Sequence, residues 1–273
     1  MNVDCLLHVH SSFSYDSHTD LADIAQTARR HRIRCVLMSE HNNRLDSNQV
    51  AAFVRRCDEL SDDQLLIVPG LELAYDSNRV HLLAYGVREF IDSSDPKCTV
   101  KSLIDAVHAA GGIAVFAHPC HRQASQRLTV DDLARLDGIE IWNVKNGNRF
   151  VPAASDLRLL RRIRSSGSGA FGFGGLDWHH LNKFVPFVLN VNTDALTADA
   201  VLRALRQGRF VVRGQYMRVP AAGDSHPGRL LAYAVASRLF ATTRRVGYRW
   251  QSALERRGVK MPAVLMSLAR RVF

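Results

Sequence analysis

The sequence predicts an α/β domain built from short strands and amphipathic helices. Short apolar runs bounded by turn residues alternate with stretches of helical periodicity throughout residues 1–217. Several of these apolar runs end directly on a histidine or a carboxylate. Strand–helix alternation of this kind favours a parallel sheet, either open or closed into a barrel.

The elements are expected in regular order. We expect strands at 3–9, 35–40, 65–73, 80–87, 113–119, 138–143, 169–178, 186–192 and 209–214. We expect helices at 21–32, 47–61, 100–112, 128–136, 155–167 and 197–208. Ser47 is a suitable polar cap for the second helix, and Gly111 and Gly112 would end the third.

Three glycines in the second half of the chain spell a dinucleotide-type pattern. Gly167, Gly169 and Gly172 give G-x-G-x-x-G, which binds a dinucleotide only when a strand precedes it and a helix follows. Here a helix precedes it and a strand follows. We therefore expect a turn into a strand at this point.

The composition is that of an ordinary soluble globular protein. The chain has 273 residues, with 47% hydrophobic and 23% charged residues, enough for one barrel-sized domain and an appendage. Its start lacks the features of a signal peptide, and no apolar run approaches the ~18 residues that span a bilayer. Five scattered cysteines without a C-x-x-C pattern suggest reduced thiols. We expect a cytoplasmic protein.

The positive charge is concentrated at the end of the chain. The net charge is +10, and the segment from Arg218 onward contains eleven Lys or Arg against two acidic residues. That segment therefore carries +9, which leaves +1 for residues 1–217. Residues 220–228 are expected to form a linker, followed by two basic amphipathic helices over 228–258 and 262–273. We therefore divide the chain into a main domain (1–217) and a basic helical extension (218–273).

Residues suited to metal binding occur at most of the expected strand ends. In an extended strand, residues two apart point to the same side, so His8 and His10 would face one metal together. Side chains at the carboxyl ends of parallel strands converge on one mouth. The nine candidates are His8, His10, Asp16, His41, Glu72, His81, His118, Asp177 and His179. Mixed imidazole and carboxylate ligands suit zinc, manganese or iron.

Six motifs in order give the chain a family resemblance. HVHSSFSYDS, MSEHN, GLEL, VHLLAYG, GGIAVFAHP and GLDWH, within residues 3–185, resemble the polymerase and histidinol phosphatase (PHP) family of metal-dependent phosphoesterases. The resemblance implies a distorted TIM-like (β/α)7 barrel with two or three divalent metal ions at its mouth. It implies that His8, His10, Glu72 and Asp177 hold one metal. Glu72 would bridge to a second metal with His81 and His118, and Asp16, His41 and His179 would hold a third.

The chain departs from the family pattern in three places. Leu176 precedes Asp177 where many members have serine, and Glu40 precedes His41 where aspartate is usual. Neither change removes a candidate ligand, although a different carboxylate beside His41 would tune the metal affinity. Only 37 positions separate His81 from His118, so the long insertion of some members is absent.

The chemistry expected of such a site is phosphate ester hydrolysis. Two close cations lower the pKa of a bridging water and hold the phosphate oxygens for in-line attack by hydroxide. Arg122, Lys145, Arg149 and Lys183 are candidates to bind the phosphate, and either His121 or His180 would protonate the leaving group.

Three functional hypotheses follow. The leading one is a phosphoesterase that acts on a small phosphorylated metabolite or nucleotide. The first alternative is a nuclease for short RNA or DNA, with the basic extension binding the phosphate backbone. The second is a membrane-surface or partner-docking protein, in which residues 228–273, with Phe240, Tyr248 and Trp250, contact an anionic membrane. Packing of these helices on the barrel is the competing interpretation of the same pattern.

Overall fold

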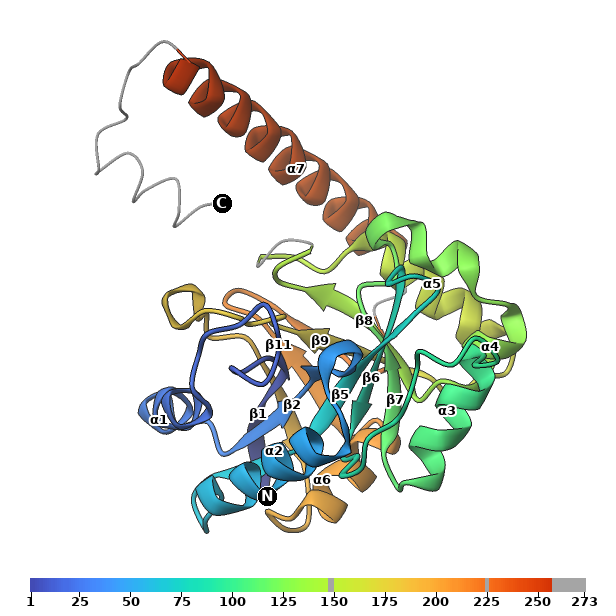
Figure 1. Ribbon diagram of the computed structural model, residues 1–273. Coiled ribbons are helices and arrows are strands. Elements are labelled where there is room, and N and C mark those ends of the chain that lie inside the picture. Colours follow the sequence, from blue (N-terminus) through green and yellow to red (C-terminus); the bar gives the residue numbers. More distant parts are fainter. Residues whose placement is uncertain (147–149, 224–225, 257–273) are drawn as a thin grey trace.

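The computed structural model describes residues 1–146, 150–223 and 226–256, with strands in two mixed sheets (Figure 1). In spatial order, the first sheet contains β12 (Arg218–Pro220), β11 (Phe210–Arg213), β10 (Val188–Asn192), β1 (Asn2–Val9), β2 (Cys35–Met38) and β4 (Leu66–Val68). The second contains β3 (Glu40–His41), β5 (Gly70–Tyr75), β6 (Val80–Tyr85), β7 (Ile113–Phe116), β8 (Gly138–Asn143) and β9 (Phe171–Gly175).

Helices connect most of these strands, close to the expected positions. They are α1 (Leu21–Arg30), α2 (Ser47–Leu60), α3 (Val100–Ala109), α4 (Val130–Arg135), α5 (Ala154–Ser165), α6 (Ala198–Arg206) and α7 (Pro227–Arg256). Short 3-10 turns occur at η1 (Asn42–Arg44), η2 (His121–Arg127) and η3 (Leu181–Lys183). The cap of α2 is Asp46 rather than the expected Ser47, because the Asp46 carboxylate accepts the backbone N–H of Gln49 in a capping box.

The expected parallel pairing holds for only part of each sheet. Strands β1, β2 and β4 are parallel, as are β7, β8 and β9, but β6 runs antiparallel to both of its neighbours. The link between β5 and β6 covers only residues 76–79, which is too short for a crossover and therefore forces a hairpin. Strands β10, β11 and β12 extend the first sheet in antiparallel fashion.

The mixed α/β fold was predicted correctly, whereas closure into a barrel is not confirmed. Neither six-stranded sheet is closed among the described residues. The two sheets are nevertheless joined at two places. Strands β2 and β4 are followed after one residue, Ser39 or Pro69, by β3 and β5 of the other sheet. After β9, the backbone N–H groups of Leu176 and Trp178 donate to carbonyls of Leu7 and His8 in β1.

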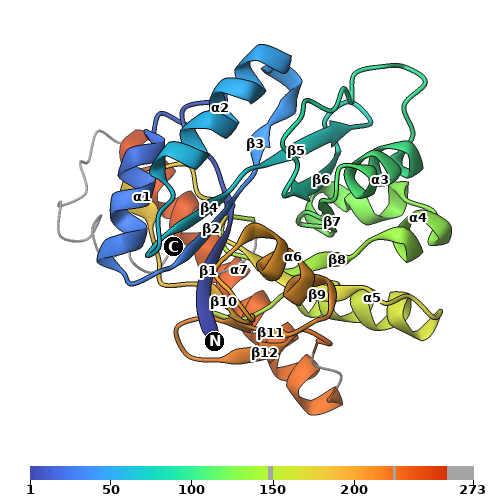
Figure 2. The same ribbon diagram turned by 90° about the horizontal axis from the view of Figure 1, so that it is seen from below.

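The strands form the centre of the domain and the helices surround them. Seen from below, α1 and α2 lie on one side of the strands and α3, α4 and α5 on the other (Figure 2). Most strand residues are buried, and every residue of β2, β7 and β8 is. This arrangement leaves the ends of the strands as the place where polar side chains meet.

The glycine pattern at 167–172 is a turn into a strand, as expected. Helix α5 ends at Ser165 and β9 begins at Phe171, which is the reverse of the order a dinucleotide site needs. Gly167 has a φ of 92°, a left-handed conformation that favours glycine.

The end of the chain differs in part from the expected linker and helices. Residues 218–220 form β12, so the sheet extends past residue 217, and the division into two domains stays a prediction. The first of the two expected basic helices is α7, and the second, at 262–273, lies outside the described residues. In the part of the chain that the structure describes, no helix is both long and apolar enough to cross a bilayer.

Candidate metal centre

The two histidines of the first motif point into one site, but not through a regular strand. The pairing of β1 with β2 is irregular between Leu7 and Val9, and His8 has a φ of 59°. This bulge interrupts the alternation on which the prediction rested. Even so, the Nε2 atoms of His8 and His10 both lie 3.3 Å from Glu72 Oε2, so the two rings converge, while their binding of one metal stays a prediction.

Glu72, on β5, is the centre of the cluster. It is buried, and its two carboxylate oxygens contact five imidazoles between them. Oε2 faces His8, His10 and His41 at 3.3 Å, and Oε1 lies 2.5 Å from His81 Nδ1 and 3.4 Å from His118 Nε2. One carboxylate therefore connects both halves of the site, as a bridging ligand does.

The antiparallel direction of β6 places His81 at the same mouth. His81 is the second residue of β6, whereas His41 ends β3 and His118 follows β7. Because β6 runs opposite to its neighbours, the beginning of this strand lies at the edge where theirs end. His81 therefore contacts Glu72 although it stands near the start of its strand and not at the end, and its role as a metal ligand stays a prediction.

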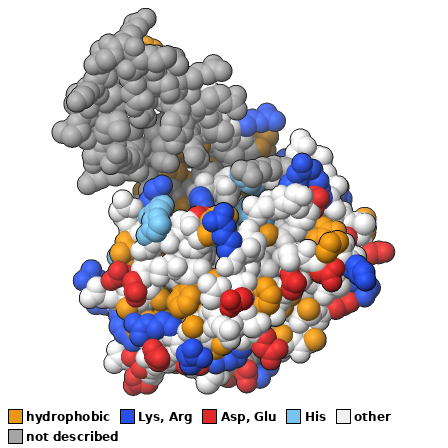
Figure 3. All heavy atoms as spheres, viewed as in Figure 1, with side chains coloured by type: hydrophobic (Ala, Val, Ile, Leu, Met, Phe, Trp, Pro, Cys, Tyr) orange, Lys and Arg blue, Asp and Glu red, His pale blue; other side chains and the backbone are white. Residues whose placement is uncertain are grey.

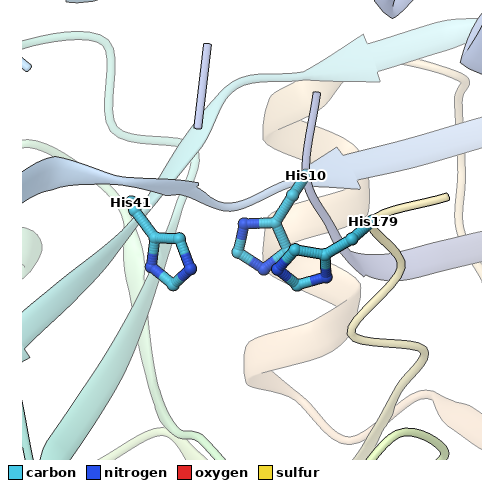
Figure 4. A group of neighbouring side chains, drawn as sticks. All are labelled: His10, His41 and His179. Atoms are coloured by element: carbon cyan, nitrogen blue, oxygen red, sulfur yellow. The ribbon is translucent and has the colours of Figure 1, made fainter. Parts of the chain in front are cut away.

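A second group of donors lies on the other side of Glu72. The rings of His10, His41 and His179 face one another (Figure 4), with ring centroids of His10 at 4.6 Å from His41 and 4.1 Å from His179. Asp16 Oδ2 lies 3.4 Å from His41 Nε2 and 3.1 Å from His179 Nε2. Asp177 Oδ1 completes the cluster, 3.9 Å from the Nε2 atoms of both His8 and His10.

The nitrogen and oxygen atoms of the cluster are arranged to bind cations and do not all find hydrogen-bond partners among themselves. Three groups have ligand atoms within 4.8 Å of each other: His10, His41 and His179; His8, Glu72 and His118; and His8, His10 and Asp177. Three buried donor atoms of the cluster, His10 Nε2, His41 Nδ1 and Asp16 Oδ1, lack a hydrogen-bond partner. Buried polar atoms rarely stay unpaired, so divalent cations are the natural partners of this set.

The protonation states of Glu72 and His10 suit metal binding. Burial alone would raise the pKa of the Glu72 carboxyl, but the imidazoles around it, above all His81 and His8, hold that pKa well below its ordinary value. Burial, helped by neighbouring imidazoles, lowers the pKa of His10 well below its ordinary value. Ionised Glu72 and neutral His10 are the protonation states that ligate a metal.

Two further buried carboxylates contact the candidate ligands or residues next to them. Glu40, identified from the sequence as a neighbour of His41, accepts hydrogen bonds from the hydroxyls of Ser11 at 2.6 Å and Ser14 at 2.5 Å. Sequence reasoning missed Glu140 of β8, whose Oε1 lies 2.8 Å from His8 Nδ1 and whose Oε2 accepts from the backbone N–H of His118 at 2.9 Å. The sequence feature that could have identified Glu140 is a charged residue in the middle of the expected strand GIEIWN.

Of the candidate phosphate-binding residues, Lys145 contacts the cluster. Its Nζ lies 2.9 Å from Asp177 Oδ1 and 3.3 Å from each ring nitrogen of His179, while the side chain stays half exposed. Lys183 is exposed in η3, beside His180. The side chain of Arg122 and the whole of Arg149 lie outside the described residues. Figure 3 shows histidine and basic side chains at the upper edge of the domain.

The two candidate acids lie at different depths. His121 is partly buried and its ring centroid is 5.6 Å from that of His118. His180 is exposed, and its ring centroid is 6.4 Å from that of His179. Both are beside the cluster, and the choice between them stays a prediction.

Two residues at the mouth were not singled out from the sequence. The ring of Tyr15 stacks on His41 with centroids 5.0 Å apart, and the guanidinium of Arg44 lies 4.4 Å from the centre of the Tyr15 ring. Arg44 belongs to η1, which directly follows His41, and it places an exposed positive charge beside Tyr15.

Comparisons with known proteins found one matching family model and several similar folds. The PHP domain model matches residues 7–126. A two-domain protein from Bacteroides vulgatus ATCC 8482, containing a predicted PHP-like metal-dependent phosphoesterase, is 14% identical with a TM-score of 0.60; the alignment covers 87% of this chain and 70% of that one. PsfC from Pseudomonas syringae PB-5123 is 15% identical with a TM-score of 0.54, covering 89% and 98%. No curated protein sequence matched.

These two structural likenesses show a shared fold. The matched segment contains His8, His10, Asp16, His41, Glu72, His81 and His118, while Asp177 and His179 reach the same cluster from beyond it. Residues 7–126 of this chain thus match the PHP domain model, and the rest of the chain lies outside the match.

Proposed function

We propose that this protein is a metal-dependent phosphoesterase that hydrolyses a phosphate ester of a small metabolite or nucleotide. The main support is the position of Glu72, whose two oxygens face five histidines inside a PHP domain. A carboxylate shared in this way is suited to hold two cations close together.

The residues that would hold the cations divide into three sets around Glu72. They are His8, His10 and Asp177; His81 and His118; and Asp16, His41 and His179. Divalent cations bound there would supply an activated water and neutralise the phosphate oxygens. Manganese, zinc and iron all suit this mixture of imidazole and carboxylate.

The protein's own residues position the substrate. Lys145 is held by Asp177 at 2.9 Å and keeps about half of its side chain exposed, so its ammonium can also bind a phosphate oxygen. Arg44 offers a second cation, held over the ring of Tyr15, which itself stacks on His41. The +1 net charge of residues 1–217 favours a small phosphate ester over a long nucleic acid.

The test is phosphate release by manganese- or zinc-loaded protein. The panel contains nucleotides, nucleoside bisphosphates, sugar phosphates, histidinol phosphate, a phosphotyrosine peptide and short RNA, and bound metal is measured in every sample. We expect release by the wild type and by His31→Ala, an exposed histidine outside the cluster, and none by Glu72→Gln or His118→Ala. Metal-loaded wild type that releases nothing, or Glu72→Gln with full activity, contradicts the proposal. Preference for RNA supports the nuclease alternative.

A further inference from the structure

The long helix α7 leaves an apolar face uncovered. Leu230 and Tyr233 in its first turns are buried, and Phe240 stacks on Phe150 with ring centroids 5.0 Å apart. Another set of apolar side chains in α7 is between 47% and 67% exposed: Leu231, Val235, Leu239, Val246 and Trp250. They follow one another at intervals of four or seven residues, which places them along one side of the helix. We call these five residues the apolar stripe.

The same helix is strongly basic. Between Pro227 and Arg256 the sequence has six arginines and a single acidic residue, Glu255, a net charge of +5. Arg238, one of the six, has an exposed side chain. An exposed apolar stripe with arginines and a tryptophan in the same helix is typical of helices that lie in the headgroup region of an anionic bilayer.

The placement of α7 leaves the stripe accessible. The contact with Phe150, which follows β8 in the same segment as Lys145, ties the middle of α7 to the mouth side of the domain. Beyond that contact, Figure 1 shows α7 projecting away from the strands. The helix can therefore meet a flat surface without any unfolding of the domain.

We propose that α7 docks on an anionic lipid bilayer, with the apolar stripe among the acyl chains and the arginines at the headgroups. A nucleic acid would be attracted by the arginines but would leave five apolar side chains in water. A second copy of the chain would place another α7 with a net charge of +5 against this one, and the two helices would repel each other. In the sequence, residues 257–273 add four basic and no acidic residues, which further favours an anionic partner for this end of the chain.

The experiment is co-sedimentation of the full chain with vesicles of phosphatidylcholine alone or mixed with phosphatidylglycerol. The test variant combines Leu231→Gln, Leu239→Gln and Trp250→Gln, which removes apolar area without changing the net charge. The matched control combines Thr242→Gln and Thr243→Gln, exposed polar residues of the same helix. Circular dichroism checks that each variant is folded.

We expect the wild type and the control to bind mixed vesicles, to bind phosphatidylcholine vesicles far less, and to be released by high salt. The test variant should bind mixed vesicles at least about tenfold more weakly, because burial of apolar side chains supplies much of the affinity. Three results overturn the proposal. They are no binding by the wild type, equal binding by the test variant and the control, and a dimer in sedimentation velocity that the test variant dissociates. The last result assigns the stripe to a second copy of the chain.

Discussion

His8 Nδ1 lies 2.8 Å from Glu140 Oε1, although 132 positions separate the two residues in the chain. The other nitrogen of the same ring, Nε2, faces Glu72 at 3.3 Å. The Glu140 carboxylate therefore holds the ring with its proton on Nδ1 and leaves the lone pair of Nε2 for a metal. Because Glu140 also accepts the backbone N–H of His118, it orients candidate ligands from two strands at once.

We expect Glu140→Gln to weaken the affinity for zinc or manganese by about 10–100-fold while the fold persists. An amide cannot accept at the same oxygen with the strength of a carboxylate, so the His8 ring loses its fixed orientation. Competition with a fluorescent chelator measures the change. Glu89→Gln, an exposed carboxylate, is the control, and equal affinity of both variants would show that Glu140 does not orient the ligand.

Gly175, at the end of β9, makes room for this carboxylate. A Cβ atom at this position would overlap Glu140 Oε1 and press on the Cβ of His8. We expect Gly175→Ala to lower the free energy of unfolding by about 1–3 kcal/mol and to weaken metal binding as well. Gly169→Ala, where a Cβ would meet nothing within 4 Å, is the matched control for urea unfolding. Identical unfolding curves for the two variants would refute this packing argument.

Lys145 should bind substrate rather than metal. If its ammonium binds a phosphate oxygen, Lys145→Gln removes a charge-assisted hydrogen bond, and KM for the best substrate should rise by about 10–100-fold with little loss of bound metal. Steady-state kinetics and metal analysis of the same samples separate the two effects. Lys183→Gln gives the comparison at an exposed residue next to the site. An unchanged KM in Lys145→Gln would remove Lys145 from the binding site.

Asp156, in the first turn of α5, predicts a pH dependence of stability. Its side chain is buried, its Oδ1 lacks a hydrogen-bond partner, and burial raises the pKa of its carboxyl to about 7. Below about pH 4 the carboxyl is protonated in both the folded and the unfolded chain, so it does not lower the free energy of unfolding. As the pH rises from about 4 to about 7, the unfolded chain ionises freely and the folded chain does not, so stability is lost.

Asp156→Asn should not lose stability in this pH range, because its side chain does not ionise. Relative to the wild type, the free energy of unfolding of the metal-free variant should increase by roughly 2–4 kcal/mol between pH 4 and pH 7 and stay level above pH 7. Urea unfolding at several pH values measures the difference. Asp131→Asn, in the exposed first turn of α4, controls for the loss of a carboxylate. Parallel pH profiles for the wild type and Asp156→Asn would contradict the prediction.

Much of the fold and of the candidate site was predictable from local patterns. The helix at 47–61 was placed within a residue of α2, because amphipathic periodicity and polar caps are properties of neighbouring residues. The nine candidate ligands were proposed from residue type and from their position in or beside short apolar runs. The pairing direction of the strands was predicted less well, since the antiparallel β6 and β10 depend on turn length and on partners far along the chain.

By itself, the sequence determined which residues could ligate a metal and the order in which the strands deliver them, because both follow from residue chemistry and short-range periodicity. Only the tertiary structure decided how those residues meet. The bulge at His8, the reversed β6 that brings His81 to Glu72, and the Glu140 carboxylate behind His8 all depend on strand pairing. Such pairing is set by burial and hydrogen bonding between distant segments, which no local pattern in the sequence specifies.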